Sequence, residues 1–229
     1  MFSLAEFGKS PDAHMRTIAR FIPGSKRRAW TFAVLLFVLS SALLFSSDAA
    51  ITAADSDSLA GQLLVASPDM KDPRFVETVI YMVKHSAEGA FGLVINRPLA
   101  KGPIQDLLKG FNAETKGAKG EIVIHYGGPV TPAAGFILHT DDVLLDNSTL
   151  VKDGIAVTSD AKLIAAIGRG KGPRQALVIM GYAGWAPGQL EAELKAESWF
   201  VVPADKRLIF GKDPEKKWRQ ALDKRRIPL

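Results

Sequence analysis

Three histidines and one arginine of this 229-residue sequence combine a side chain suited to chemistry with a place near the end of an apolar run. His85, His125 and His139 each lie at or near the end of an apolar, strand-like run, and Arg97 ends another such run. An imidazole can act as a general base, and a guanidinium can stabilise a developing negative charge. A hydrolase that uses His85 or His139 as its base and Arg97 as its electrophile is therefore chemically possible, provided that these side chains share one cleft.

No reaction motif or metal motif accompanies these residues. The spacing of the three histidines matches no compact zinc-binding pattern. The sequence has no cysteine, so it offers no thiolate ligand, disulfide or cysteine nucleophile. No serine lies in a G-x-S-x-G context. The sequence therefore predicts no catalytic residue, no metal site and no cofactor, and a structural role is the default for each histidine.

Two glycines and a proline, Gly127, Gly128 and Pro129, follow the run that contains His125. Consecutive backbone N–H groups at paired glycines could form a small nest for an anion. The same residues could instead form a tight turn between the strands expected around 122–125 and 136–139. The Lys-Ser/Thr pair of a P-loop does not follow, so a nucleotide phosphate is not expected there.

Arg97 lies between Asn96 and Pro98, where another apolar run ends. A guanidinium in this position could bind a carboxylate or a phosphate of a ligand. It could equally form an internal ion pair with a carboxylate of the domain, such as Asp72 or Glu193. The sequence leaves both interpretations open.

A third junction, Gly181–Leu194, runs from an apolar strand through a Gly/Pro turn into a helix. Trp185 in this turn could line a pocket or pack in the core, and Gln189 follows near the start of the helix. Together the three junctions predict one shared surface for an unidentified small anion or protein segment. The candidate ligand-binding residues of this surface are His85, Asn96, Arg97, Gly127, Gly128, His139, Trp185 and Gln189.

The elements that would position these residues follow from the apolar runs and the turn residues that bound them. Strands are expected at 62–67, 78–84, 91–96, 121–125, 135–139, 176–181 and 199–202. Helices are expected at 103–109, 159–167, 187–198 and 213–224, where a capping residue or a proline begins the helical pattern. Because strands outnumber helices and the helices are scattered, the sequence predicts an α+β fold with a mixed or barrel-like sheet.

The net charge of +5 is distributed unevenly along the chain. Residues 1–47 hold six basic and two acidic residues, residues 205–229 hold nine and four, and residues 48–204 hold fourteen and eighteen. A nucleic-acid interface requires a basic face on the folded domain. Because the basic excess is confined to the two ends, direct nucleic-acid binding is not expected.

An uncharged and mostly apolar run covers residues 29–47, with Lys26, Arg27 and Arg28 before it and Asp48 after it. Its length is closer to a membrane-spanning helix than to the apolar region of a signal peptide. The positive-inside rule would keep the basic cluster in the cytoplasm and send the rest of the chain outward. The sequence thus predicts a basic region at 1–28, a membrane anchor or signal segment at 29–47, a linker at 48–58 and a folded domain at 59–229.

The three junctions, in this order and spacing, resemble the YqgE/AlgH family of bacterial proteins. The matching segments, which lie within residues 59–225, include GQLLVASP from Gly61, DPRF from Asp72, HSAEGAFGLVINRP from His85, GGPV from Gly127, FILH from Phe136 and the run from Gly181 to Glu193. The resemblance implies an α+β domain whose branched sheet curls toward a small barrel and is surrounded by helices. It implies no catalytic residue, because the family is mostly of unknown biochemical function. The hydrophobic segment before the Gly61 motif departs from the usual pattern of the family.

These observations favour a non-enzymatic binding or regulatory module that residues 29–47 tether to the membrane. The hydrolase described above is one alternative. Another is an indirect transcriptional regulator, since one branch of the family is associated indirectly with regulation of alginate synthesis. The expected localisation is the bacterial inner membrane, single-pass, with the C-terminal domain outside the cytoplasm. A periplasmic protein after signal cleavage, or a cytoplasmic protein if the start codon is misassigned, are the alternatives.

Overall fold

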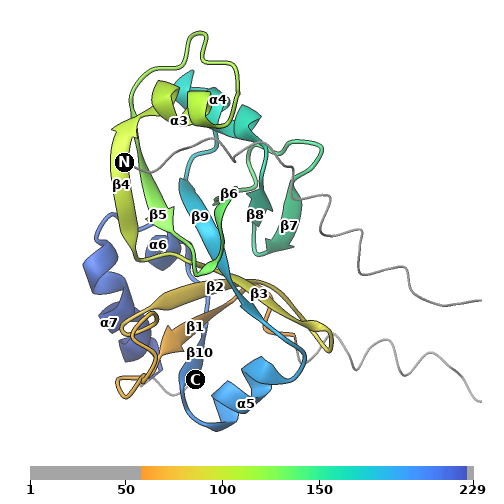
Figure 1. Ribbon diagram of the computed structural model, residues 1–229, viewed down its shortest axis with the longest axis vertical. Helices are drawn as coiled ribbons and strands as arrows, with labels where there is room; N and C mark the ends of the chain where they lie inside the picture. The colour runs from red at the N-terminus through yellow and green to blue at the C-terminus, as the bar shows by residue number, and fades with distance from the viewer. Residues whose placement is uncertain (1–57, 226–229) are drawn as a thin grey trace, which may run out of the picture. The chain divides into compact units, whose positions relative to one another are not determined.

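A ten-stranded sheet dominates residues 58–225, which are the residues that the structure, a computed structural model, describes (Figure 1). Eight of the strands follow the order β10-β1-β2-β3-β9-β6-β8-β7, and β4 and β5 join through the pairing of β5 with β9. The strands are β1 (Gln62–Ala66), β2 (Val79–Ser86), β3 (Gly89–Val94), β4 (Pro98–Pro103), β5 (Glu121–Tyr126), β6 (Val130–Thr140), β7 (Thr149–Lys152), β8 (Ile155–Thr158), β9 (Ala176–Trp185) and β10 (Trp199–Pro203). The helices are α3 (Ile104–Gly110), α4 (Ala161–Gly168), α5 (Gln189–Lys195), α6 (Lys206–Ile209) and α7 (Pro214–Lys224).

The sheet branches at β9, which has three partners. Over its first half β9 pairs with β5 in parallel and with β6 in antiparallel orientation. Its last residues, Ala183 to Trp185, pair with β3 instead. Figure 1 shows the result: α3 and α4 lie at one end of the long strand β9, and α5 lies at its other end. A strand has only two edges, and β5 and β6 occupy both edges of β9 over its first half. The third partner, β3, therefore pairs with a different part of β9.

The sheet curls into a half-barrel, in which β7, at one end of the strand order, comes back to the start of β1, the neighbour of β10 at the other end. An added Cβ on Gly61, just before β1, would lie 2.5 Å from Cβ of Lys152 in β7. The main core fills the inside of this curl with side chains from most of the strands, and α6 and α7 add Leu208, Ile209 and Leu222. The predicted α+β class with a mixed, branched and partly barrel-like sheet is confirmed.

Each of the seven strands and four helices expected from the sequence corresponds to an element of the structure. The strands β4, β7 and β8 and the short helix α6 were not expected. β4 contains two prolines and a glycine, and such a strand is tolerated only because it lies at an edge and pairs with β5 alone. The tight turn expected between the strands at 122–125 and 136–139 is present as the short connection 127–129, but β5 and β6 do not pair as a hairpin, because β9 lies between them and pairs with both.

Within residues 58–225, no helix is long and apolar enough to cross a membrane. The apolar run at 29–47, the basic region at 1–28 and almost all of the linker at 48–58 lie outside the described residues.

Lys217 of α7 is a buried lysine, 1% exposed, whose ammonium group meets no carboxylate among the described residues. It donates hydrogen bonds to the carbonyl oxygens of Ile95 at 3.0 Å and Ile209 at 2.6 Å. Burial disfavours the charged form and lowers the pKa of Lys217 from 10.5 to about 8. The helix α7 is therefore attached to the end of β3 through a titratable group.

We expect the free energy of unfolding to rise with pH across the range in which Lys217 loses its proton. Above pH 8 the folded state releases this proton while the unfolded chain, with a pKa of 10.5, retains it, so alkali favours folding. The gain between about pH 8 and about pH 10 is about 2 kcal/mol. Urea unfolding at several pH values measures it. Lys217→Met should flatten the slope, and Lys216→Met, at the exposed neighbouring position, should keep it; an unchanged slope in Lys217→Met would contradict the assignment.

Candidate functional site

The loop between β1 and β2, residues 67–78, lies at the centre of the candidate site. Asn96 holds it from one side: its Oδ1 accepts from the backbone N–H of Val79 at 2.9 Å, and its Nδ2 donates to the Glu77 carbonyl oxygen at 2.9 Å. From another side, the ring of Phe75 packs edge-on against Trp199, with centroids 5.5 Å apart. Long loops that are held in one shape by a rigid sheet are frequent sites of recognition.

Arg97 is half-buried and points at this loop. It donates a hydrogen bond to the carbonyl oxygen of Val76 at 2.6 Å, and no carboxylate forms an ion pair with it among residues 58–225. Asp72 and Glu193, the internal partners considered from the sequence, are engaged elsewhere. The backbone N–H of Tyr126 donates to the Arg97 carbonyl oxygen, so the two residues are neighbours where the pairing of β4 with β5 begins.

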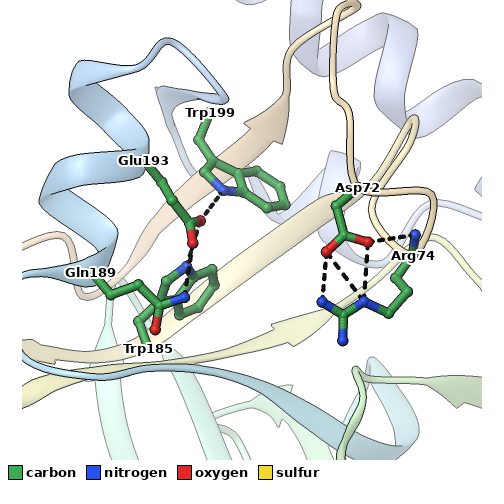
Figure 2. A network of polar contacts seen from close by, with 6 residues as sticks. All are labelled: Asp72, Arg74, Trp185, Gln189, Glu193 and Trp199. Atoms are coloured by element: carbon green, nitrogen blue, oxygen red, sulfur yellow. Dashed lines mark hydrogen bonds and ion pairs between the residues drawn. The ribbon is translucent and has the colours of Figure 1, made fainter.

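Arg74 adds a second guanidinium to this surface. Asp72 accepts from it through both carboxylate oxygens, which holds the pKa of Asp72 below its usual range and raises the pKa of Arg74 (Figure 2). Tyr126 is close enough to Arg74 to contribute in the same direction to its pKa. Arg74 also lies over the ring of Phe75 at 5.7 Å. The exposed residue Val76, 43% accessible, lies between these cationic groups along the chain.

Trp185 and Gln189 belong to a second cluster with Glu193 and Trp199, which Figure 2 shows apart from the Asp72–Arg74 pair. The indole N–H groups of Trp185 and Trp199 both donate to Oε2 of Glu193, at 2.9 and 2.8 Å. The Gln189 amide donates to Oε1 at 2.9 Å and accepts from the Ala186 N–H. The polar groups of this cluster thus satisfy one another, and its main effect is to fix α5 against β9 and β10.

Gly127 and Gly128 lie at the branch of the sheet, in contact with β9. The Gly127 N–H donates to the Met180 carbonyl oxygen at 2.7 Å, and the Gly127 carbonyl accepts from Val94. Side chains at either glycine would overlap the backbone of Gly181 or Tyr182. The Gly127 amide is therefore part of the sheet and is not free to form the anion-binding nest considered from the sequence.

His85 lies near the end of β2 and is fully engaged. Its Nδ1 accepts from the Leu59 N–H at 3.1 Å, and its Nε2 lies 2.8 Å from Oε1 of Glu191. Because the ring's lone pair already receives an N–H, His85 has no free basic nitrogen.

His139 and His125 are buried. His139 donates from Nδ1 to the Thr140 carbonyl oxygen at 2.9 Å, and its Nε2 has no partner within the described residues. Burial lowers the pKa of both imidazoles, with the nearby charge of Lys217 acting in the same direction on His125. Both rings are thus favoured in the neutral form, as expected of structural histidines.

The structure does not bring His85, His139 and Arg97 into one cleft. Ala90 in β3 is the partner of His85. Arg97 follows Ala90 by seven residues, which span about 20 Å of extended backbone, so Arg97 lies far from His85. His139 pairs with Ala176 at one end of β9, whereas Arg97 lies beyond β5, level with Met180 four residues further along β9, so about 20 Å separates His139 from Arg97. The geometry required for the hydrolase is therefore absent from the described residues.

Of the predicted site residues, the structure groups Asn96 and Arg97 around the 67–78 loop and Trp185 and Gln189 around Glu193. His139 stands apart from both groups. Sequence reasoning missed Arg74 and Tyr126 beside Arg97, and Trp199 in the Glu193 cluster. Arg74 and Tyr126 lie inside or beside the recognised motifs, but only the folded chain brings them together.

Comparison with known proteins identifies relatives over this same region. The family described as AlgH-like matches residues 63–229. A UPF0301 protein of Methylococcus capsulatus is 43% identical over 169 residues, which are 74% of this chain and 92% of the relative. One from Nitrobacter hamburgensis is 41% identical over 187 residues, covering 78% of this chain and 87% of the relative.

Solved structures show the same fold. The solution structure of the AlgH protein from Pseudomonas aeruginosa is similar with a TM-score of 0.63 and 34% identity, over 75% of this chain and 91% of that protein. A crystal structure of a protein from Corynebacterium diphtheriae, 22% identical, is similar in fold with a TM-score of 0.58 over 74% of this chain and 87% of that protein. The extent of the match and the shared half-barrel show that this chain belongs to the AlgH-like UPF0301 family, whose function is uncharacterised.

Proposed function

We propose that this protein is a non-enzymatic binding or regulatory module, tethered to the membrane through residues 29–47 with its domain outside the cytoplasm. The ligand is an anionic group, free or carried on a protein segment, that binds where Arg97, Arg74 and Tyr126 meet the 67–78 loop. The match to the AlgH-like family over residues 63–229 supports a domain of this family. The basic–apolar–acidic order of the N-terminal sequence supports the tether.

One observation carries the proposal: Arg97 is a half-buried cation without a carboxylate partner among residues 58–225. A guanidinium has five N–H donors, and the hydrogen bond to Val76 occupies one nitrogen. Its planar fork suits a carboxylate or a phosphate in a bidentate arrangement. The Arg74–Asp72 ion pair beside it carries no net charge, so Arg97 is the cation that remains for a ligand, and exposed Val76 adds an apolar contact; a protein segment with an acidic group would satisfy both features.

Binding of an anion is tested by thermal unfolding of the full chain, with inorganic phosphate and acetate as probes. We expect the melting temperature to rise with one of these probes, because a ligand that binds only the folded state stabilises it. Arg97→Gln should lose the response. Arg169→Gln is a matched control, since Arg169 is an exposed arginine that also donates to a backbone carbonyl, that of Lys116.

A protein partner is tested by placing a photo-crosslinking residue at position 76 in native membranes, with position 150, another exposed apolar site, as the control. A specific adduct at 76 that disappears in Arg97→Gln supports the proposal. Equal anion responses in both arginine variants, together with no adduct specific to 76, would refute it. Membrane fractionation and sequencing of the mature N-terminus test the membrane tether separately. If the protein is found in the cytoplasm, the tether is refuted, while the proposal for the anion site stands.

A further inference from the structure

His85 lies where the described part of the chain begins, and it ties the first residues of the domain to the sheet. The Leu59 N–H donates to Nδ1 of His85 at 3.1 Å, and the Ser58 hydroxyl donates to the His85 carbonyl oxygen at 3.1 Å. On the opposite edge of the ring, Nε2 lies 2.8 Å from Oε1 of Glu191 in α5. One imidazole therefore connects the start of the domain, β2 and α5.

These two contacts determine which nitrogen carries the hydrogen. An N–H group such as that of Leu59 only donates, so Nδ1 must present its lone pair. Nε2 must then carry the hydrogen and donate it to the Glu191 carboxylate. The side chain of His85 is 10% exposed, whereas that of Glu191 is 54% exposed, so the ring is enclosed while its acidic partner is reached by water.

A second proton on this ring has opposite effects on the two contacts. At Nε2 the bond to Glu191 becomes a charge-assisted bond between imidazolium and carboxylate, which is stronger than the neutral one. At Nδ1 a new N–H would face the Leu59 N–H, and two donors cannot share a hydrogen bond. Protonation therefore keeps the attachment to α5 and removes the attachment to Leu59.

The charged surroundings of His85 are few among the described residues. Glu191 is the acidic group that faces the ring from α5, and its pKa is lowered by its own backbone N–H and by His85, so it stays ionised in mild acid. From β3 the neighbour of His85 is Ala90, which carries no charge. The segment at 58–60 contributes backbone groups and the Ser58 hydroxyl.

We propose that His85 is a proton-operated latch on the Leu59 amide: the neutral ring accepts the Leu59 N–H, and protonation in mild acid releases it. The bond from the Ser58 hydroxyl to the His85 carbonyl and the packing of the Leu59 side chain do not depend on this proton. The latch stands on hydrogen-bond geometry alone and does not depend on whether the Arg97 surface binds an anion.

Amide hydrogen exchange measured by NMR on the ¹⁵N-labelled full chain tests the latch. We expect the protection of the Leu59 amide, corrected for intrinsic exchange, to fall at least about tenfold between about pH 7.5 and about pH 5. The Val94 amide, which donates to Gly127 inside the sheet, serves as the reference for global opening. The ¹⁵N shifts of the ring should show the hydrogen on Nε2 at neutral pH.

Two variants separate the latch from a general effect of acid. His85→Asn retains an oxygen near the position of Nδ1 but does not titrate, so its Leu59 protection should not depend on pH. Glu191→Gln keeps an acceptor for Nε2 but removes the charge that favours the imidazolium, so the transition should move to lower pH. A hydrogen on Nδ1 at neutral pH, or Leu59 protection that does not fall relative to Val94 in the unmodified chain, would overturn the proposal.

Discussion

Replacing Gly128 by alanine is expected to prevent folding or to lower the free energy of unfolding by about 4 kcal/mol or more. The backbone of Gly128 has φ of +145°, a conformation open essentially to glycine alone. An added Cβ would overlap the backbone of Tyr182 and Ala183 in β9. A backbone cannot move aside as a side chain can, so the branch of the sheet would have to separate.

Gly102→Ala is the matched control for this change. Gly102 also lies in a strand, β4, but an added Cβ there meets nothing within 4 Å. Its effect should stay within about 0.5 kcal/mol, as for most exposed substitutions. Urea unfolding followed by circular dichroism compares the two variants. Equal stability of Gly128→Ala and Gly102→Ala would show that the packing of β9 against the Gly127–Gly128 turn is not as tight as described.

Glu193→Ala is expected to lower the free energy of unfolding by about 3 kcal/mol. The substitution removes the shared acceptor of two indole N–H groups, those of the buried Trp185 and Trp199. The amide of Gln189 loses its partner as well. A buried donor without a partner keeps its full desolvation cost, which is why loss of one carboxylate has a large effect.

Two further variants give this prediction its controls. Glu193→Gln preserves one acceptor oxygen and should cost less, about 1–2 kcal/mol. Glu88→Gln changes the same chemical group at an exposed turn between β2 and β3 and should be close to neutral. Tryptophan fluorescence during unfolding includes the signals of Trp185 and Trp199, two of the four tryptophans of the chain. If Glu193→Ala were as stable as Glu88→Gln, the network in Figure 2 would not contribute to holding α5.

Local sequence patterns were sufficient for most of the secondary structure. Apolar runs bounded by turn residues predicted β1, β2, β3, β5, β6, β9 and β10, and capping residues or prolines predicted the four longer helices. The short strands β7 and β8 and the edge strand β4 have weak patterns of their own. They form because neighbouring strands offer them hydrogen-bond partners, which is a property of the assembled sheet.

The candidate site was less accessible to sequence reasoning. Arg97 was recognised as a cation at a strand end, but its choice between a ligand and Asp72 or Glu193 depended on where those carboxylates go. The paired glycines were recognised as a junction, but their contact with β9 shows that the Gly127 amide belongs to the sheet and is not free for an anion. In both cases the deciding groups are far away in the chain and close only after folding.

By itself, the amino-acid sequence determined the family, the α+β class and the position of most elements, because periodicity, turn chemistry and motifs are local properties of the chain. Tertiary structure alone decided that β9 separates β5 from β6, that Lys217 is buried beneath the end of β3, and that two tryptophans share the carboxylate of Glu193. These outcomes depend on which distant strands pair and in which register. Register is set by the packing of the whole core rather than by any one segment.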